Sequence, residues 1–259
     1  MSGDSRFQFG EVEARCARSL IAMAIEEDFG RDGDLTSTLT VPLRAEGTAQ
    51  FVARTPGVLA GLPVVELFAR ELQLGGHWQP HRADGDTLDR GTLIAEIAGP
   101  VRSILCFERI ALNFLQRLSG VASLTARFVQ AVSGTSAEIY DTRKTTPGWR
   151  PLEKYAVRCG GGRNHRMGLY DAILIKDNHL AFLQGETSQD PITAAIMAAR
   201  AGVPRSTIVE VEVDSLDQFD VALGCRPDII LLDNLGAESL QEAVSRRDAI
   251  ARDVKLEAS

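Results

Sequence analysis

The second half of the chain alternates short apolar runs with helical segments, and this rhythm limits the possible folds more than any other feature. The apolar runs occupy residues 137–141, 171–175, 208–213, 228–232 and 253–258. Between the later runs, helical periodicity covers residues 191–202, 215–224 and 237–247. Repeated strand–helix units are typical of a parallel sheet covered by helices, as an open sheet or an α/β barrel. The sequence therefore predicts an α/β fold.

Earlier segments mix helices and strands without this regular alternation. Val12, Cys16, Leu20 and Met23 recur at helical spacing, which predicts a helix over residues 12–28, and the DFGRDGDLTS segment after it predicts a loop. Further predicted elements are strands at 48–53 and 93–97, helices at 61–72, 103–118 and from 121 to 132, and turns at 75–91. The Ser119-Gly120 pair separates the last two helices. We therefore predict one domain over residues 1–118 and a second over 119–259.

Composition places the chain among ordinary globular proteins. Of its 259 residues, 44% are hydrophobic and 24% are charged. No apolar run approaches the roughly 18 residues of a membrane span, and the N-terminus does not resemble a signal peptide, so we expect a cytoplasmic protein. The four cysteines form no CxxC pair, which argues against a zinc site or disulfides. The net charge of −7 argues against nucleic-acid binding.

The charge is unevenly distributed along the chain. Residues 141–179 hold eight Lys/Arg against four Asp/Glu, whereas the remainder holds 20 basic against 31 acidic residues. A basic island in an acidic chain indicates an anionic ligand small enough to need only a pocket. The alternative is a solvated charged face.

Polar residues end each of the five predicted strands. These ends carry Asp141-Thr142-Arg143-Lys144, Lys176-Asp177-Asn178-His179, Glu210 with Glu212, Asp233-Asn234, and Glu257-Ala258-Ser259. Catalytic residues of α/β barrels gather at the C-terminal ends of the strands. We therefore expect these groups to converge on one pocket.

Glu210 and Glu212 are two residues apart on a strand, so both project from the same face, opposite three valines. Two inward carboxylates need cations, which Arg143, Lys144 and Lys176 or a bound Mg²⁺ could supply. The alternative is a structural network of buried salt bridges, and the two interpretations are compatible.

A glycine triplet at residues 160–162 follows a predicted helix over 151–159, and His165 and Arg166 come directly after it. Glycines allow close approach of backbone to an anion, although alone they are a weak phosphate signal. The Thr145–Gly148 turn would hold Arg143 and Lys144 in place. Arginine suits carboxylates and lysine suits phosphate. The set therefore fits one polycarboxylate and one polyphosphate.

The segment DTRKTTPGWRPLEKYAVRCGGGRNHRMGLYDAILIKDNHL strongly resembles the signature of the quinolinate phosphoribosyltransferases, also called nicotinate-nucleotide pyrophosphorylases. The resemblance continues upstream through EDFGRDGDLTS, ARTPGVLAG and ERIALNFLQRLSGVAS, and downstream through VEVEVDS and DIILLDN. It spans nearly the whole chain, and its central block is highly specific.

The resemblance implies a reaction and an architecture. Quinolinate and phosphoribosyl pyrophosphate would give nicotinate mononucleotide, pyrophosphate and CO₂, with Mg²⁺ as cofactor. An N-terminal α/β sandwich domain and a partial α/β barrel of fewer than eight strands are implied. The family further implies a homodimer with shared active sites, and a higher oligomer is possible.

The resemblance also implies roles for individual residues. Lys144, Lys176, Glu212 and Asp233 are the expected catalytic residues, and Glu212 and Asp233 are also the expected ligands of Mg²⁺. The cationic quinolinate pocket would consist of Arg143, Lys144, His165, Arg166 and Lys176. Arg109 matches the arginine that reaches the neighbouring subunit's site. Thr142 and Ser259 complete the expected substrate-binding set.

Family members continue past LEAS into a glycine-rich loop and a further strand, whereas the sequence given stops at Ser259. The expected barrel is therefore C-terminally truncated. We expect this form to bind the phosphoribosyl donor weakly and to be less stable.

Three alternatives remain at this stage. A lysine at a barrel strand end also suits a Schiff-base lyase that uses Lys176. The chain could instead be a non-catalytic relative that only binds a ligand. A related pyrophosphorylase acting on another base is the hardest alternative to exclude.

Overall fold

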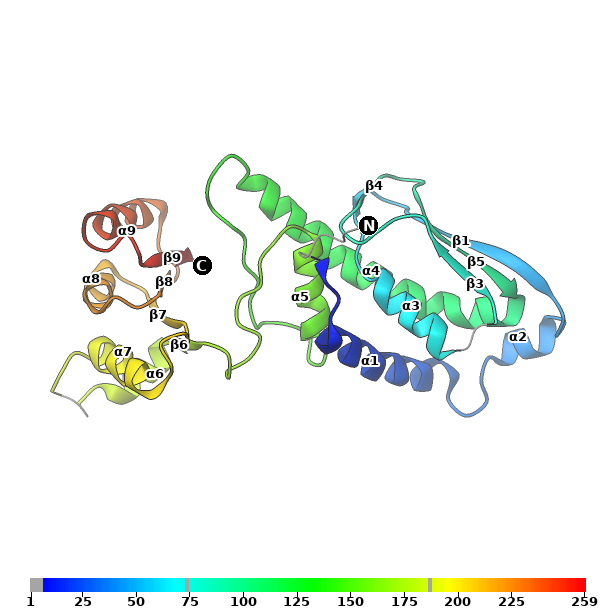
Figure 1. Ribbon diagram of the computed structural model, residues 1–259, viewed down its shortest axis with the longest axis horizontal. Helices are drawn as coiled ribbons and strands as arrows, with labels where there is room; N and C mark the ends of the chain where they lie inside the picture. Colours follow the sequence, from blue (N-terminus) through cyan, green and yellow to red (C-terminus); the bar gives the residue numbers. More distant parts are fainter. Residues whose placement is uncertain (1–6, 73–74, 186–187) are drawn as a thin grey trace. The chain divides into compact units, whose positions relative to one another are not determined.

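The computed structural model describes residues 7–72, 75–185 and 188–259 (Figure 1). The chain divides into two compact units, Met1–His165 and Arg166–Ser259. Each unit has its own hydrophobic core. The fold class is the predicted one, because the first unit contains an antiparallel sheet with helices and the second a parallel sheet with helices.

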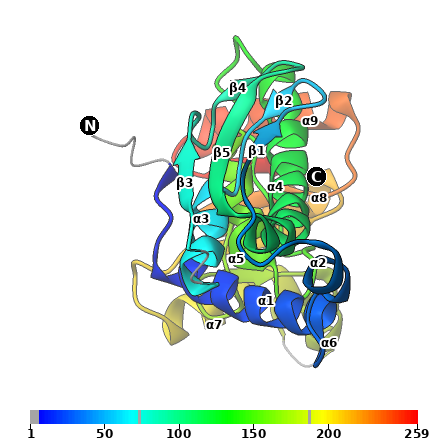
Figure 2. The same ribbon diagram turned by 90° about the vertical axis from the view of Figure 1, so that its right-hand side faces the viewer.

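An antiparallel sheet of three strands, in the order β1-β5-β3, organises the first unit (Figure 2). Its strands are β1 (Glu46–Val52), β3 (His77–Pro80) and β5 (Leu93–Pro100), and β2 (Gly57–Val58) pairs with β4 (Thr87–Leu88) separately. The sheet contacts helices α3 (Leu62–Glu71) and α4 (Val101–Ala131). Helices α1 (Glu11–Phe29), α2 (Leu35–Thr40) and α5 (Arg150–Cys159) complete the unit.

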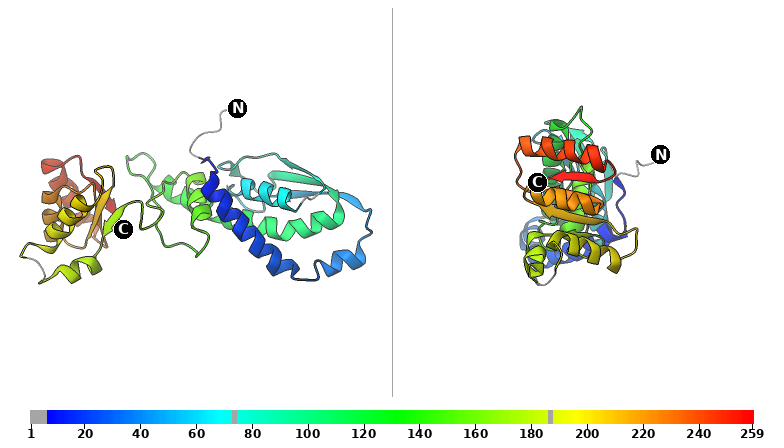
Figure 3. Two further views of the ribbon diagram at one scale, coloured as in Figure 1. Left: turned by 60° about the horizontal axis from the view of Figure 1, so that its bottom comes forward. Right: turned by 90° about the vertical axis from the view of Figure 1, so that its left-hand side faces the viewer.

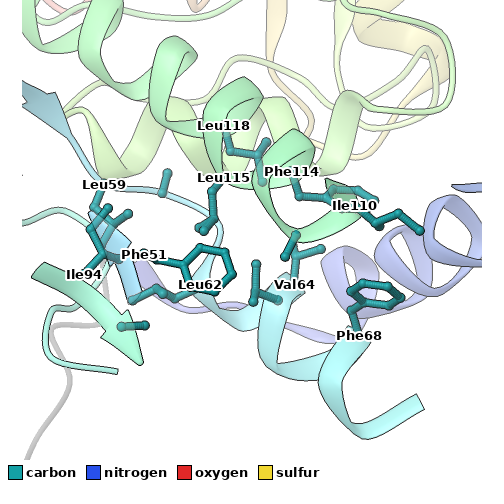
Figure 4. Packing of buried hydrophobic residues seen from close by; sticks show 14 of the residues in the cluster. Phe51, Leu59, Leu62, Val64, Phe68, Ile94, Ile110, Phe114, Leu115 and Leu118 are labelled. Atoms are coloured by element: carbon teal, nitrogen blue, oxygen red, sulfur yellow. The ribbon is translucent and has the colours of Figure 1, made fainter. Parts of the chain in front are cut away.

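The core of the first unit lies between α4, α3 and the sheet (Figure 4). Ile110, Phe114 and Leu118 follow one another at four-residue spacing along α4, so they form one apolar stripe, and all three are buried. Phe68 of α3 stacks on Phe107 of α4, with ring centroids 5.1 Å apart. This stripe fixes α4 against α3 and the sheet.

Helix α4 runs without interruption through the Ser119-Gly120 pair, where the sequence predicted a break. Ala60 lies two residues after β2, and its backbone N–H donates to the Ser119 hydroxyl at 3.1 Å. Leu118 and Ala122 are fully buried on either side. One helical glycine costs about 1 kcal/mol, and this burial outweighs it. The domain boundary that we predicted at residues 118/119 falls inside α4, and it stays a prediction.

Other differences occur where local patterns were too short to recognise. Helix α2 replaces part of the predicted loop, because Asp34 caps it by accepting from the backbone N–H of Ser37 at 2.9 Å. Strands β3 and β4 form within the predicted turns. Residues 137–141 form no strand, and only one bridge joins Tyr140 to Arg163. That run therefore belongs to a loop of the first unit.

A parallel sheet in the order β6-β7-β8-β9 organises the second unit (Figure 3). Its strands are β6 (Ile173–Ile175), β7 (Val209–Val213), β8 (Ile229–Leu232) and β9 (Lys255–Ala258). The crossovers contain α6 (Asp177–Leu183) and α7 (Pro191–Gly202), then α8 (Leu216–Cys225), then α9 (Ala237–Ile250). The strand order follows the chain order, as the strand–helix rhythm predicted.

The two faces of this sheet differ in polarity. One face packs against the helices through Ile175, Val209, Val211, Val213, Ile230 and Leu232. The register pairs Glu212 of β7 with Leu231 of β8, and Leu231 with Glu257 of β9, so Glu212 and Glu257 lie on the same face of the sheet. Glu210, two residues before Glu212, lies on that face too, opposite the face that packs against the helices. The predicted separation of valines from glutamates on β7 is therefore confirmed.

Among the described residues, no helix is long and apolar enough to cross a membrane.

Asp84 connects α3 to α5 inside the first unit. Its carboxylate accepts from the backbone N–H groups of Gly61 and Leu62, at 2.7 and 3.1 Å, and from the hydroxyl of Tyr155 at 2.7 Å. Burial raises the pKa of Asp84 above its ordinary value, although these hydrogen bonds act in the opposite direction.

We expect this raised pKa to appear in the pH dependence of stability. Below the unfolded pKa of about 3.9 the carboxyl is neutral in both states. As the pH rises through the raised folded pKa, the cost of burying the charge appears. The unfolding free energy of the wild type relative to Asp84→Asn should therefore be largest near pH 4 and decline at higher pH. Urea unfolding of both proteins between pH 4 and pH 8 measures this, and a constant difference contradicts it.

Candidate active site

The cationic segment of the first unit is anchored by a buried ion pair. Lys154 on α5 is fully buried, and its ammonium donates to Asp141 and, at 2.9 Å, to the backbone carbonyl of His165. Asp141 also accepts from the Asn164 amide at 2.6 Å and from the His165 backbone N–H at 2.9 Å. One carboxylate thus joins the start of the Asp141–Lys144 segment to His165.

The turn after Lys144 is held by the first turn of α5. Arg150 donates from Nε to the Thr145 hydroxyl at 3.0 Å. Glu153 accepts from the Thr146 backbone N–H at 3.2 Å and also pairs with Arg117 of α4. The predicted rigidity of this turn therefore comes from α5 as well as from Pro147.

The cations of the first unit differ in how well they are paired. The Nε of Arg143 is buried and has no hydrogen-bond partner within the described chain. Lys144 is exposed and forms no ion pair with any described residue. A buried guanidinium nitrogen without an acceptor is costly and rare. Arg143 and Lys144 are therefore suited to an anionic ligand.

Arg109 lies elsewhere in the first unit, on the exposed side of α4. It lines an open cavity of about 1100 Å³ formed by β1, the segment around β2, and α4. Of the predicted site residues in the described chain, it alone lines this cavity. The structure of the single chain thus does not bring Arg109 together with Arg143 and Lys144.

The glycine triplet has a packing role that the sequence did not reveal. A Cβ at Gly160 would lie 2.3 Å from the Ala122 carbonyl oxygen, and one at Gly162 would lie 2.8 Å from the Thr125 methyl group. Gly161 has φ +87°, which disfavours other residues. The triplet therefore lets the end of α5 approach α4 closely, which explains these glycines without an anion.

Gly160→Ala is expected to lower the free energy of unfolding by about 2 kcal/mol, because the added methyl overlaps the α4 backbone. Gly120→Ala is the matched control, since its Cβ would meet nothing within 4 Å and helix propensity favours alanine. Urea denaturation compares the two variants. Equal stability of both would show that α4 and α5 can separate without cost.

The second unit holds the predicted site residues that follow His165 along the chain. Lys176 directly follows β6 and forms an ion pair with Glu212 of β7. The Lys176 side chain is 42% exposed and that of Glu212 13%. Arg166 donates to the Ala172 carbonyl at 3.0 Å, beside the start of β6. The end of β6 and the face of β7 therefore carry opposite charges in direct contact.

Asp233 and Ser259 follow the ends of neighbouring strands β8 and β9. The backbone N–H of Asn234 donates to the Ser259 carbonyl at 3.1 Å, and Asn234 adopts φ +55°. The Asn234 amide donates to the Asp233 carboxylate at 2.9 Å. These contacts place Asp233 at the same strand ends of the sheet as Lys176.

Sequence reasoning missed the supports of the site. Asp141 was assigned no role beyond a strand end, and Lys154, Glu153 and Asn164 were not singled out. A signal existed for Lys154, because it stands among Leu152, Tyr155 and other buried residues on a short helix. A lysine at such a position needs a buried acceptor.

An α/β fold whose strand ends and loops carry cations and carboxylates is typical of a class, the α/β enzymes that act on anionic substrates. The chain belongs to the quinolinate phosphoribosyl transferase family, whose N-terminal domain matches residues 34–119 and whose C-terminal domain matches residues 121–259. The resemblance drawn from the motifs is thereby confirmed.

Named relatives agree with this assignment. The nicotinate-nucleotide pyrophosphorylase [carboxylating] of Mycobacterium leprae is 43% identical over 251 residues, covering 96% of this chain and 86% of the relative. The solved nicotinate-nucleotide pyrophosphorylase from Francisella tularensis is 35% identical, with a TM-score of 0.86 over 100% of this chain and 86% of that one. NadC from Streptococcus pyogenes is 38% identical, with a TM-score of 0.87 over 97% and 85%.

Proposed function

We propose that this protein transfers the phosphoribosyl group of phosphoribosyl pyrophosphate to quinolinate, with decarboxylation, to give nicotinate mononucleotide for NAD synthesis. The family and the names of its relatives support this activity. The observation that carries the proposal to this chain is the buried, partnerless Nε of Arg143, which a substrate carboxylate would satisfy. We also propose a cytoplasmic location.

The cations have the task of binding a dianion. In the proposal, the two carboxylates of quinolinate take charge-assisted hydrogen bonds from Arg143, Lys144, His165, Arg166 and Lys176. Thr142 and Ser259 supply neutral hydrogen bonds to the substrates. Holding two anionic substrates together against their repulsion is the main catalytic task, since positioning alone can lower a barrier by about 7–11 kcal/mol.

The carboxylates have the task of stabilising positive charge on the sugar. The pyridine nitrogen is itself the nucleophile, so no serine or cysteine needs activation. When pyrophosphate leaves, the ribosyl carbon gains oxocarbenium character, and Glu212 and Asp233 would stabilise it and hold the ribose hydroxyls. The positive charge of the quaternary ring nitrogen then stabilises the electron pair that stays on the ring carbon as the 2-carboxylate leaves as CO₂, and a proton takes the place of the carboxylate on that carbon.

We propose Mg²⁺ as the cofactor. Carboxylate oxygens are the ligands that Mg²⁺ prefers, so Glu212 and Asp233 fit this ion, and Mg²⁺ usually keeps several waters besides. When bound, the ion would neutralise charge on the departing pyrophosphate. Treatment with EDTA should abolish product formation, and added Mg²⁺ should restore it.

We propose further that the protein acts as a homodimer with shared active sites. The exposed position of Arg109 supports this, because the arginine lines a cavity of the first unit and pairs with no described residue there. A partner subunit would give it an anionic target. Sedimentation equilibrium measures the oligomer. Complementation tests the sharing: mixing Arg109→Ala with a separate Lys176→Ala variant should regenerate activity.

A product assay tests the proposed function. The purified chain is incubated with phosphoribosyl pyrophosphate, Mg²⁺ and either quinolinate or nicotinate, and nicotinate mononucleotide is measured by chromatography. We expect product from quinolinate and little from nicotinate, which lacks the second carboxylate. Binding without product would indicate a ligand-binding relative, and product from another base would indicate a related pyrophosphorylase.

A further inference from the structure

A buried charge pair stands at the base of the cationic segment, and neither of its residues is among the proposed substrate ligands. The Lys154 and Asp141 side chains are 1% and 8% exposed. Replacing a buried ion pair by apolar residues of similar size is often neutral or stabilising. The pair is thus poorly explained by stability alone, and its geometry indicates another purpose.

The geometry of Asp141 is that of a bridge. On one side, its own backbone leads directly into Thr142, Arg143 and Lys144. On the other, its two carboxylate oxygens accept from the Asn164 side chain and the His165 backbone, at 2.6 and 2.9 Å. Two separate stretches that carry proposed substrate ligands therefore share one carboxylate.

Lys154 fixes this bridge to a rigid element. Its ammonium reaches both ends of the bridge, Asp141 and the His165 carbonyl. It projects from α5, whose residues Arg150 and Glu153 hold the following turn at Thr145 and Thr146. One helix thus holds the cationic segment at its beginning, through Lys154, and at its end.

We propose that Lys154 and Asp141 are positioning residues, which set the places of Arg143, Lys144 and His165 for quinolinate through their buried ion pair. This inference rests on the proposed function for the identity of the substrate. A displacement of about 1 Å in groups that orient a substrate can lower the rate 100-fold. We therefore expect a loss of that order in kcat/KM when the pair is removed as a unit.

The experiment removes both charges together, because a single change would leave a buried charge unpaired. Lys154→Met with Asp141→Asn preserves the volumes of both side chains. Tyr155→Phe is the matched control: Tyr155 is the next residue on α5 and is equally buried, but its hydroxyl bonds to Asp84. For each protein we would measure Tm, kcat, KM for both substrates, and hydrogen exchange of residues 142–146 and 163–165.

The expected result separates positioning from stability. The double variant should keep a Tm close to that of Tyr155→Phe, while its kcat/KM for quinolinate falls about 100-fold and the two stretches exchange faster. KM for quinolinate should rise more than KM for phosphoribosyl pyrophosphate. Unchanged kcat/KM and exchange, or a loss no greater than that of Tyr155→Phe, would overturn the proposal.

Two further measurements keep the test decisive. If the double variant does not fold, Asn164→Ala removes one of the bridge's hydrogen bonds and leaves both charges in place; a quinolinate KM that stays at the wild-type value then overturns the proposal. If the wild type makes no product from quinolinate, the proposed function fails separately. Hydrogen exchange still decides the positioning role in that case, because it needs no substrate.

Discussion

Replacement of Arg143 by alanine is expected to lower kcat/KM for quinolinate about 1000-fold, the largest effect that we expect from any single substitution. Removing one partner of a buried, hydrogen-bonded charge pair costs about 2–5 kcal/mol, and a factor of 1000 corresponds to about 4 kcal/mol. The buried Nε without a partner indicates that the free protein holds this arginine ready for an acceptor. The variant should fold normally, since no ion pair with a described residue is lost.

The chemistry of the substitution distinguishes charge from shape. Arg143→Lys keeps the positive charge but not the planar guanidinium. Its kcat/KM should therefore be about tenfold higher than that of Arg143→Ala and still about 100-fold below the wild type. Arg163→Ala is the control, because that arginine pairs with Glu138 at the surface and should change kcat/KM less than twofold. Steady-state kinetics at varied quinolinate measures all three. A wild-type KM in Arg143→Ala would refute the assigned role.

The sequence predicted the second unit better than the first. Strand β8 is a continuous apolar run of isoleucine and leucine, and β7 alternates valine with glutamate, so local pattern alone identified both. The alternation of valine and glutamate on β7 also predicted which face is polar. In the first unit, the short run at residues 137–141 also predicted a strand, but only one bridge joins it to a neighbouring segment.

The sequence pointed to the charged residues of the candidate site but not to the residues that hold them in place. Lys176 directly follows β6, and a strand end needs only local sequence to be recognised. Arg143 and Lys144 come shortly after residues 137–141, whose apolar pattern drew attention to them although the run forms no strand. Lys154 acts through Asp141, 13 residues away, and through a carbonyl 11 residues away. These partners lie in the segments before and after α5, and no local period encodes how those segments return to the helix.

Glu212→Gln is expected to lower kcat about 300-fold with little change in quinolinate KM. Glutamine keeps the size and one acceptor of the side chain but removes the negative charge that would face the sugar. Removing one preorganised group that stabilises transition-state charge lowers kcat by about 100- to 1000-fold. Single-turnover measurement of nicotinate mononucleotide formation gives the chemical step directly. Glu242→Gln is the control, since Glu242 pairs with Arg246 on the exposed side of α9.

Glu212 could act on the sugar directly or only by holding Lys176, with which it is paired. The double variant Lys176→Met with Glu212→Gln separates these roles. If Glu212 acts only through Lys176, the double variant should be no slower than Lys176→Met alone, because the partner is already gone. If Glu212 also stabilises charge on the ribose, the double variant should lose a further tenfold or more in kcat. We expect the second result, because a carboxylate that only paired with lysine would leave the oxocarbenium centre with Asp233 as its sole proposed counter-charge.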